Sequence, residues 1–207
     1  MHSLVLASNN PGKLAELFPL FAPLGYALVA QGELGVCEAE EPFHTFVENA
    51  LAKARNAARH TGLPAVADDA GLCVAAFGGL PGVQTAYYAT QFGLPKGDAN
   101  NVRVLLEQLA PHSNRQAALV STLVAVRHAE DPEPLIAVGR ASGTVPLQPV
   151  GTGGFGFDPV LYIPAMGCTF AQMTPEKKTL HSHRGQAARR MVDLMREAWG
   201  RELDALA

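Results

Sequence analysis

The order of apolar and amphipathic segments constrains this fold more than any other feature of the sequence. Apolar segments at residues 3–7 and 26–30 have the length of short buried strands, and helix-like segments follow them. Two long β-type segments come later, 116–128 and 135–145, and the short loop between them predicts a hairpin. Strands that alternate with helices before a hairpin predict an α/β protein with a mixed sheet flanked by helices.

Several helix ends carry their own signals. Thr45 followed by Glu48 is a capping-box pattern, which predicts the start of a long helix. Asp98 is expected to cap a later helix in the same way. An earlier helix, from about Lys13, has apolar residues on one face at positions i, i+3, i+4 and i+7: Leu14, Leu17, Phe18 and Phe21.

Composition bounds the class of protein. A chain of 207 residues predicts one domain over residues 1–207, and 48% apolar against 17% charged residues can supply its core. The net charge of −3 argues against a general binder of nucleic acid or of anionic membranes.

No apolar run approaches the roughly 20 residues of a membrane helix. Three scattered cysteines without a CxxC pair suit reduced thiols and argue against zinc. A soluble cytoplasmic protein with a small-molecule partner is expected.

A polar turn joins the first expected strand to the first helix. It places Ser8, Asn10 and Lys13 at a helix N-terminus, where backbone N–H groups and the helix dipole attract phosphate. The same spacing is typical of an ordinary helix cap, so both interpretations stay open. The turn is not a Walker loop, because the sequence lacks Gly-x4-Gly-Lys-Ser/Thr.

Acidic residues gather at two places. Asp68 and Asp69 are expected to end a buried strand at 65–67. Three glutamates occupy an earlier loop: Glu38, Glu40 and Glu41. Because α/β proteins place ligands at strand ends and Mg²⁺ prefers carboxylate oxygens, these groups predict a metal site. Simple solvation of the acidic side chains is the competing interpretation.

Residues 151–156 match the GxGxxG pattern letter for letter. In a dinucleotide site that loop opens a helix, but here another strand, 160–163, is expected to follow, so the Rossmann interpretation fails. A flexible loop that brings Phe155 and Phe157 near a flat group remains. A glycine-rich turn with a buried phenylalanine explains the pattern equally well.

Basic residues cluster where the closing helix, 184–203, is expected to begin behind a cap at Ser182. Lys178, His183 and Arg184 belong to this cluster. The positive end of a helix disfavours cations, so an anionic or hydrogen-bond-accepting group is expected nearby. An exposed basic loop is the alternative.

Six segments, in this order, resemble the inosine triphosphate pyrophosphatase family, which removes the non-standard purine nucleotides ITP, dITP and XTP. The resemblance runs from Leu4 to about Ala188. Its motifs are Ser8-x-Asn10-x-x-Lys13, Phe46-Val47-Glu48-Asn49-Ala50, Ala67-Asp68-Asp69, Leu80-Pro81-Gly82-Val83, the stretch from Gly151 to Pro159, and Ser182-His183-Arg184-Gly185. It implies an elongated α/β fold with two lobes and a central cleft, and a homodimer. It also implies Mg²⁺-dependent hydrolysis between the α- and β-phosphates, which yields a nucleoside monophosphate and pyrophosphate.

The resemblance implies roles for individual residues. Asp69 would activate the attacking water and bind the metal together with Glu40, for which Glu41 is a close competitor. The triphosphate would lie on the polar turn: Ser8, Asn9, Asn10, Pro11, Gly12 and Lys13. The nucleotide and its purine would be enclosed by a second set: Ala70, Phe155, Gly156, Phe157, Asp158, Lys178, His183 and Arg184.

Two positions depart from the family pattern. Ala70 stands where many relatives carry serine, and Phe157 where tyrosine is frequent, so two hydroxyl groups are missing. Donors from His183 and Arg184 suit a purine with an oxygen at its 6-position, because the amino group of adenine would leave a donor unpaired. Two alternatives stay open: a pyrophosphatase for modified pyrimidine or methylated nucleotides, and a sensor that binds a triphosphate without cleaving it.

Overall fold

The computed structural model describes residues 3–204. These residues form two compact units. Unit one contains the chain up to Asp69, Ser121–Gly139 and the chain from Arg184 onward, and unit two contains Ala70–Val120 and Arg140–His183. The single domain over residues 1–207 stays a prediction, and its residues 1–2 and 205–207 lie outside the described part.

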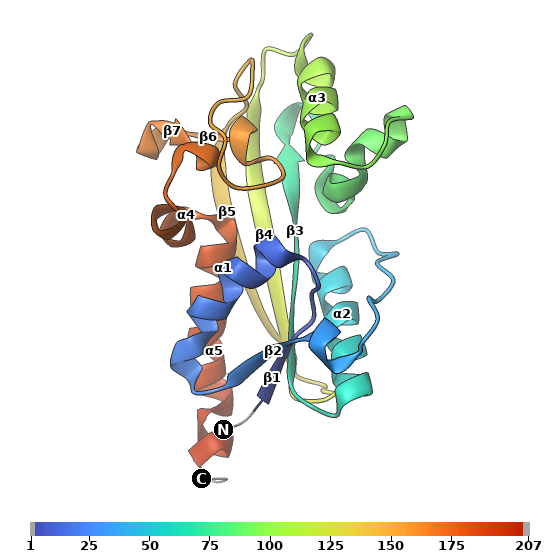
Figure 1. The fold of residues 1–207 in the computed structure, drawn as a ribbon, viewed down its shortest axis with the longest axis vertical. Helices are drawn as coiled ribbons and strands as arrows, with labels where there is room; N and C mark the ends of the chain where they lie inside the picture. Colours follow the sequence, from blue (N-terminus) through green and yellow to red (C-terminus); the bar gives the residue numbers. More distant parts are fainter. Residues whose placement is uncertain (1–2, 205–207) are drawn as a thin grey trace. The chain divides into compact units, whose positions relative to one another are not determined.

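The strands form one seven-stranded sheet in the order β2-β1-β3-β4-β5-β6-β7 (Figure 1). β1 pairs in parallel with β2 and β3, whereas β6 pairs antiparallel with β5 and β7. The predicted mixed sheet is therefore confirmed, and β4 and β5 are neighbours as a hairpin requires. The strands are β1 (Ser3–Leu6), β2 (Ala27–Ala30), β3 (Ala65–Val74), β4 (Gln116–Val126), β5 (Leu135–Thr144), β6 (Tyr162–Ile163) and β7 (Cys168–Thr169).

Unit one has helices on both faces of its strands. α1 (Pro11–Phe21) and α5 (His183–Asp204) cover one face, and α2 (Phe46–Thr61) covers the other (Figure 1). Strand alternation divides the apolar side chains between them, because successive residues of a strand point to opposite faces. In β1, Leu4 and Leu6 pack with α1 and α5, whereas Val5 packs with three buried alanines of α2: Ala54, Ala57 and Ala58.

β3 is longer than expected and holds the aspartate pair in its interior. The strand predicted to end on Asp68 and Asp69 continues to Val74. That prediction was wrong because ammonium groups of Lys13 and Lys53 pair with the two carboxylates inside the fold. Paired charges can be buried, so they do not have to stand at the end of a strand.

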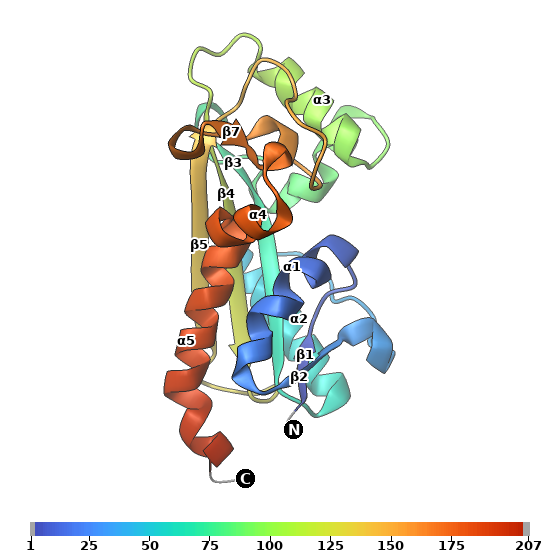
Figure 2. The same ribbon diagram turned by 60° about the vertical axis from the view of Figure 1, so that its left-hand side comes forward.

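Unit two is built around α3 (Asp98–Leu109) and a 3₁₀ segment, Gly82–Phe92, which pack against each other (Figure 2). The predicted apolar face of α3 is confirmed, since Val102, Leu105 and Leu109 lie in the core of this unit. α4 (Pro175–His181) has no counterpart in the sequence analysis; Thr174 caps its start.

The predicted helix ends are partly correct. The hydroxyl of Thr45 accepts the backbone N–H of Glu48 and caps α2 as expected. Asp98 does not act as a cap: Gly97 holds that position, and Asp98 is the first residue of α3. Ser182 ends α4 directly before α5 begins at His183. Within residues 3–204, no helix has the length and hydropathy needed to cross a membrane.

Residues 151–156 lead into a 3₁₀ turn, Asp158–Val160, and then into β6. The absence of a helix directly after this loop, within the described chain, confirms that it is not a dinucleotide-binding loop.

Leu105→Ala tests the core of unit two. Leu105 is fully buried on α3, so its truncation leaves a cavity and should lower the free energy of unfolding by about 2–5 kcal/mol. Glu107→Ala, at an exposed position of the same helix, should change it by less than about 0.5 kcal/mol. Urea denaturation followed by circular dichroism measures both, and equal midpoints for the two variants would contradict this packing.

Candidate functional site

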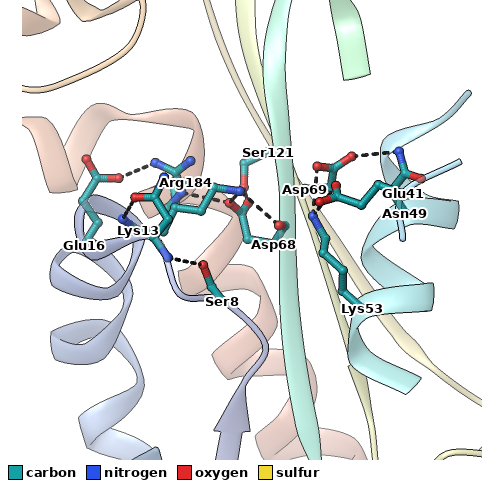
Figure 3. A network of polar contacts seen from close by, with 11 residues as sticks. Ser8, Lys13, Glu16, Glu41, Asn49, Lys53, Asp68, Asp69, Ser121 and Arg184 are labelled. Atoms are coloured by element: carbon teal, nitrogen blue, oxygen red, sulfur yellow. Dashed lines mark hydrogen bonds and ion pairs between the residues drawn. The ribbon is translucent and has the colours of Figure 1, made fainter. Parts of the chain in front are cut away.

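Adjacent aspartates in β3 serve two different polar networks. Because neighbouring side chains of a strand point to opposite faces, Asp68 faces α1 and α5 while Asp69 faces α2 (Figure 3). The apolar residues before them follow the same rule: Val66 packs with α1 and α5, and Ala67 packs with α2. One strand thus supplies both carboxylates, and both networks lie within unit one.

Asp68 is the buried centre of the first network. Its Oδ2 accepts from Lys13 Nζ at 2.8 Å and from Arg184 Nε at 3.1 Å, and the Ser121 hydroxyl donates to its Oδ1 at 2.5 Å. Burial alone would raise the pKa of Asp68, but the two positive charges and these hydrogen bonds hold it well below its usual range. Asp68 is therefore ionised at neutral pH.

Arg184 belongs to this network, a contact that differs from those predicted for it, and its predicted place beside a purine stays a prediction. Its Nε donates to Asp68, and its Nη1 donates to Glu16 of α1 at 2.5 Å. The residue is only 3% exposed. The reason for the difference is electrostatic, because the buried Asp68 carboxylate needs positive partners and Arg184 is one of them.

The polar turn before α1 is a helix cap. Asn10 Oδ1 accepts the backbone N–H of Lys13 at 3.1 Å, and Ser8 Oγ accepts the N–H of Asn10 at 3.2 Å. The cap interpretation is therefore confirmed, and the turn also directs Lys13 toward Asp68. Of the other predicted turn residues, Asn9 and Pro11 are exposed and Gly12 is half-buried.

Lys53 of α2 is the centre of the second network, and the sequence analysis did not identify it. Its Nζ lies 3.1 Å from Asp69 Oδ1 and 2.8 Å from Glu41 Oε2. Asn49, one turn earlier on α2, donates to Asp69 Oδ2 at 3.4 Å. The spacing of Asn49 and Lys53, four residues apart in a predicted helix, was the signal that these side chains share a face.

The pKa values of this pair follow from burial and charge. Burial raises the pKa of the Asp69 carboxyl above its usual value, and the Lys53 ammonium limits that rise. Burial alone would lower the pKa of Lys53, but the Asp69 and Glu41 carboxylates raise it above its usual value. Lys53 therefore stays protonated.

The acidic loop is fixed at its base by Asn49. The Asn49 side chain donates to the Phe43 carbonyl at 3.2 Å and accepts the Phe43 N–H at 3.1 Å. This pairing accompanies the contact of Glu41 with Lys53, although Glu40 and Glu41 are both exposed to solvent. Of the two glutamates considered for a metal, Glu41 is the one that shares a partner with Asp69.

The donor set fits a hard divalent cation that also binds phosphate. Within the described residues, no three His, Cys, Asp or Glu side chains gather closely enough to hold a metal ion by themselves. Two carboxylates, Glu41 and Asp69, share one positive charge, the Lys53 ammonium. Mg²⁺ commonly takes only one or two protein carboxylates and completes its shell with phosphate oxygens and water.

Unit two holds a separate constellation around Asp158. The Asp158 carboxylate is buried, pairs with Lys178 Nζ at 2.6 Å and accepts the backbone N–H of Phe155 at 2.8 Å. Lys178 Nζ also lies 4.5 Å from the centroid of the Phe155 ring. A Cβ at Gly154 would lie 2.0 Å from Asp158 Oδ2, and Gly154 has a φ of +73°, so only glycine fits here.

The remaining predicted residues of unit two differ in their surroundings. Phe157 is 3% exposed and packs in the apolar core, so the stacking on a ligand predicted for it does not fit this structure. A glycine-rich turn with a buried phenylalanine was the alternative interpretation, and the burial of Phe157 agrees with it. His183 is buried near Phe170, with ring centroids 6.4 Å apart. Ala70 is half-buried on β3, and Gly156 donates its N–H to Asp98.

The sequence matches the model of the Ham1 family over residues 4–194. The dITP/XTP pyrophosphatase of Acidovorax sp. (strain JS42) is 71% identical over 95% of this chain and 96% of its own. The dITP/XTP pyrophosphatase of Paracidovorax citrulli is 69% identical over 95% of this chain and 98% of its own.

The fold is also similar to solved structures. The HAM1 protein from Coxiella burnetii aligns with a TM-score of 0.89 and 41% identity, over 96% of this chain and 100% of its own. A nucleoside-triphosphatase / dITP/XTP pyrophosphatase from Mycobacterium abscessus aligns with a TM-score of 0.71 and 40% identity, over 91% and 98%.

Asp68→Ala tests the first network. The substitution leaves Lys13 and Arg184 without their shared carboxylate, so we expect the free energy of unfolding at pH 7 to fall by about 3–5 kcal/mol. Asp193→Ala, an exposed aspartate of α5, is the control and should change it by less than about 0.5 kcal/mol.

The pH dependence of the free energy of unfolding tests the same network. Folding lowers the pKa of Asp68, so its contribution is complete above the pKa of about 4 in the unfolded chain and is lost as the pH falls below it. Urea unfolding between pH 7 and pH 3 should therefore show a smaller loss of stability for Asp68→Ala than for the parent protein. Parallel curves would show that the carboxylate is not held by these cations.

Proposed function

The chain belongs to the Ham1 family, and from this premise we propose that it hydrolyses non-standard purine nucleoside triphosphates. Its substrates are dITP, XTP and ITP, and its products are the nucleoside monophosphate and pyrophosphate. The observation that carries the proposal is the 71% identity, over nearly the whole chain, to a dITP/XTP pyrophosphatase. The cations and carboxylates of unit one supply the chemistry that cleavage of a phosphoanhydride needs.

Lys13 is proposed to bind the phosphates. Its ammonium stands in the first turn of α1, where the positive end of the helix dipole favours anions. Asp68 positions this ammonium, and Arg184 holds Asp68 from the other side. The turn residues Ser8 and Asn10 would add polar contacts from the edge of the helix.

Asp69 is proposed as the general base and, with Glu41, as the ligand of Mg²⁺. When bound, the ion neutralises phosphate charge and lowers the pKa of a water that it coordinates. Asp69 accepts the proton of the attacking water, and its pKa, which burial raises in the protein without metal, marks it as a stronger base than Asp68. Lys53 pairs with both Glu41 and Asp69, and this shared partner supports Glu41 over Glu40 as the second ligand.

The residues around Phe155 are proposed to receive the base. Phe155 offers an aromatic face, and Lys178 offers donor groups beside it. His183 supplies a further ring with polar nitrogens in the same unit. Donors in this position suit the 6-oxygen of hypoxanthine or xanthine, whereas the 6-amino group of adenine would leave a buried donor unpaired at a cost of about 1–3 kcal/mol.

The family resemblance further leads us to propose a homodimer. Removal of faulty nucleotides from the precursor pool and the reduced state expected for the three cysteines support a cytoplasmic location. Neither nucleic acid nor a membrane is proposed as a partner.

A product analysis tests the proposed reaction. The purified protein with Mg²⁺ should convert dITP, XTP and ITP to the monophosphate and pyrophosphate, with kcat/KM at least about tenfold higher than for dATP and dGTP. Chromatography of nucleotides and pyrophosphate distinguishes the outcomes. Release of a nucleoside diphosphate and phosphate would show cleavage between the β- and γ-phosphates and would contradict the proposed reaction. Preference for 5-methyl-UTP would favour the pyrimidine alternative, and binding without turnover would favour the sensor.

Asp69→Asn tests the assignment of the base. The variant keeps the volume and polarity of the side chain but cannot accept the proton, so kcat for dITP should fall by about 10²–10⁴-fold. Isothermal titration should show that the variant still binds dITP. Parental turnover by Asp69→Asn would exclude Asp69 as the base, and Asp193→Asn serves as the control.

A further inference from the structure

Asp98 holds a loop that lies far from it in the sequence. Its Oδ2 accepts the backbone N–H of Gly156 at 2.7 Å, so the start of α3 is tied to the glycine-rich loop 151–156 (Figure 2). The N–H of the preceding residue, Phe155, donates to Asp158 Oδ2 at 2.8 Å. The two peptide groups that flank the Phe155 Cα are therefore each held by a carboxylate.

These two bonds matter because the loop has little stiffness of its own. Gly154 and Gly156, on either side of Phe155, have positive φ values of +73° and +61°. Glycine has wide conformational freedom, so a segment flanked by glycines samples many directions unless other groups restrain it. The Asp158 carboxylate restrains the peptide before Phe155, and the Asp158 N–H donates to the Phe155 carbonyl at 3.2 Å. Asp98 adds a restraint on the N–H of the peptide after Phe155, from a different element.

We infer that Asp98 is a positioning residue for the base of the substrate. By holding the peptide after Phe155, it fixes the direction of the aromatic ring that Lys178 faces at 4.5 Å. Asp98 does not touch the substrate in this scheme; it acts through Phe155. The inference rests on the proposed function, since it assigns Phe155 to the nucleotide base.

A second effect of Asp98 has to be separated from this one. A carboxylate in the first turn also stabilises a helix through the helix dipole, and its removal would weaken α3. Asp98→Asn removes the charge but keeps an oxygen that can accept the Gly156 N–H. Asp98→Ala removes both the charge and the acceptor. If only the helix dipole matters, both substitutions should change KM equally. If Asp98 positions the loop, only Asp98→Ala should raise KM.

The first experiment measures steady-state kinetics with dITP and the melting temperature of each variant. Asp98→Ala should raise KM by about three- to tenfold, the factor expected for one lost hydrogen bond, with kcat within about twofold of the parent. Asp98→Asn should keep KM within about twofold, although both variants should melt below the parent because both lose the charge at the start of α3. Glu107→Ala on the same helix should leave KM unchanged. An unchanged KM in Asp98→Ala, or an equal rise in both variants, overturns the inference.

The second experiment tests whether Asp98 acts through Phe155. If it does, Asp98→Ala combined with Phe155→Leu should raise KM no further than Phe155→Leu alone, because coupled residues are not additive. Multiplicative effects overturn the inference.

Hydrogen exchange measured by mass spectrometry gives a readout independent of turnover. Amides of residues 155–156 should exchange faster in Asp98→Ala than in the parent or in Asp98→Asn. Unchanged exchange in Asp98→Ala overturns the tether itself. An inactive parent enzyme overturns the proposed function, whereas an active Asp98→Ala variant with parental KM overturns only this inference.

Discussion

The buried carboxylate of Asp68 is the interaction on which the first network depends. It joins four elements of unit one, because its partners Lys13, Ser121 and Arg184 come from α1, β4 and α5 while Asp68 itself lies in β3. A carboxylate can be buried only if enough positive charge and hydrogen bonds compensate for lost hydration. The same requirement therefore holds the ammonium of Lys13 beside β3. The contacts that bury this carboxylate also position the ammonium that is proposed to bind phosphate.

The alternation of a single strand gives two adjacent aspartates opposite properties. Asp68 faces two cations and its pKa is lowered, while the pKa of Asp69 is raised by burial against one cation that it shares with Glu41. The first carboxylate is held in its ionised form by its partners, and the second, which is the proposed base, has a pKa above the usual value of aspartate. This difference in pKa arises because neighbouring residues of a strand face opposite sides, and it needs no difference in residue type.

The sequence predicted the secondary structure better than it predicted the contacts between distant side chains. Local patterns such as the Thr45 cap and the apolar face of α3 were sufficient to identify their helices, because these signals act within one or two turns. The length of β3 was not predictable from its own residues, since the cations that allow Asp68 and Asp69 inside it come from other elements. The same reason explains Lys53 and Arg184. Lys53 was overlooked and the contact of Arg184 with Asp68 was not predicted, because their partners are 16 and 116 residues away in the chain.

The alanines of α2 have a consequence for how the site could change. Ala54, Ala57 and Ala58 bring this helix against β1 and β3 with almost no side-chain volume between them. The distance between Lys53 and Asp69 therefore depends on how closely the backbone of α2 packs on the sheet, and the methyl groups of these alanines set that packing distance. A larger apolar residue at one of these positions would lift the helix and separate the charges, although no polar group had been altered. The packing distance of α2 therefore influences the pKa of Asp69 through the distance between Lys53 and Asp69. Substitutions in the apolar core can change the acidity of Asp69 without altering any polar residue.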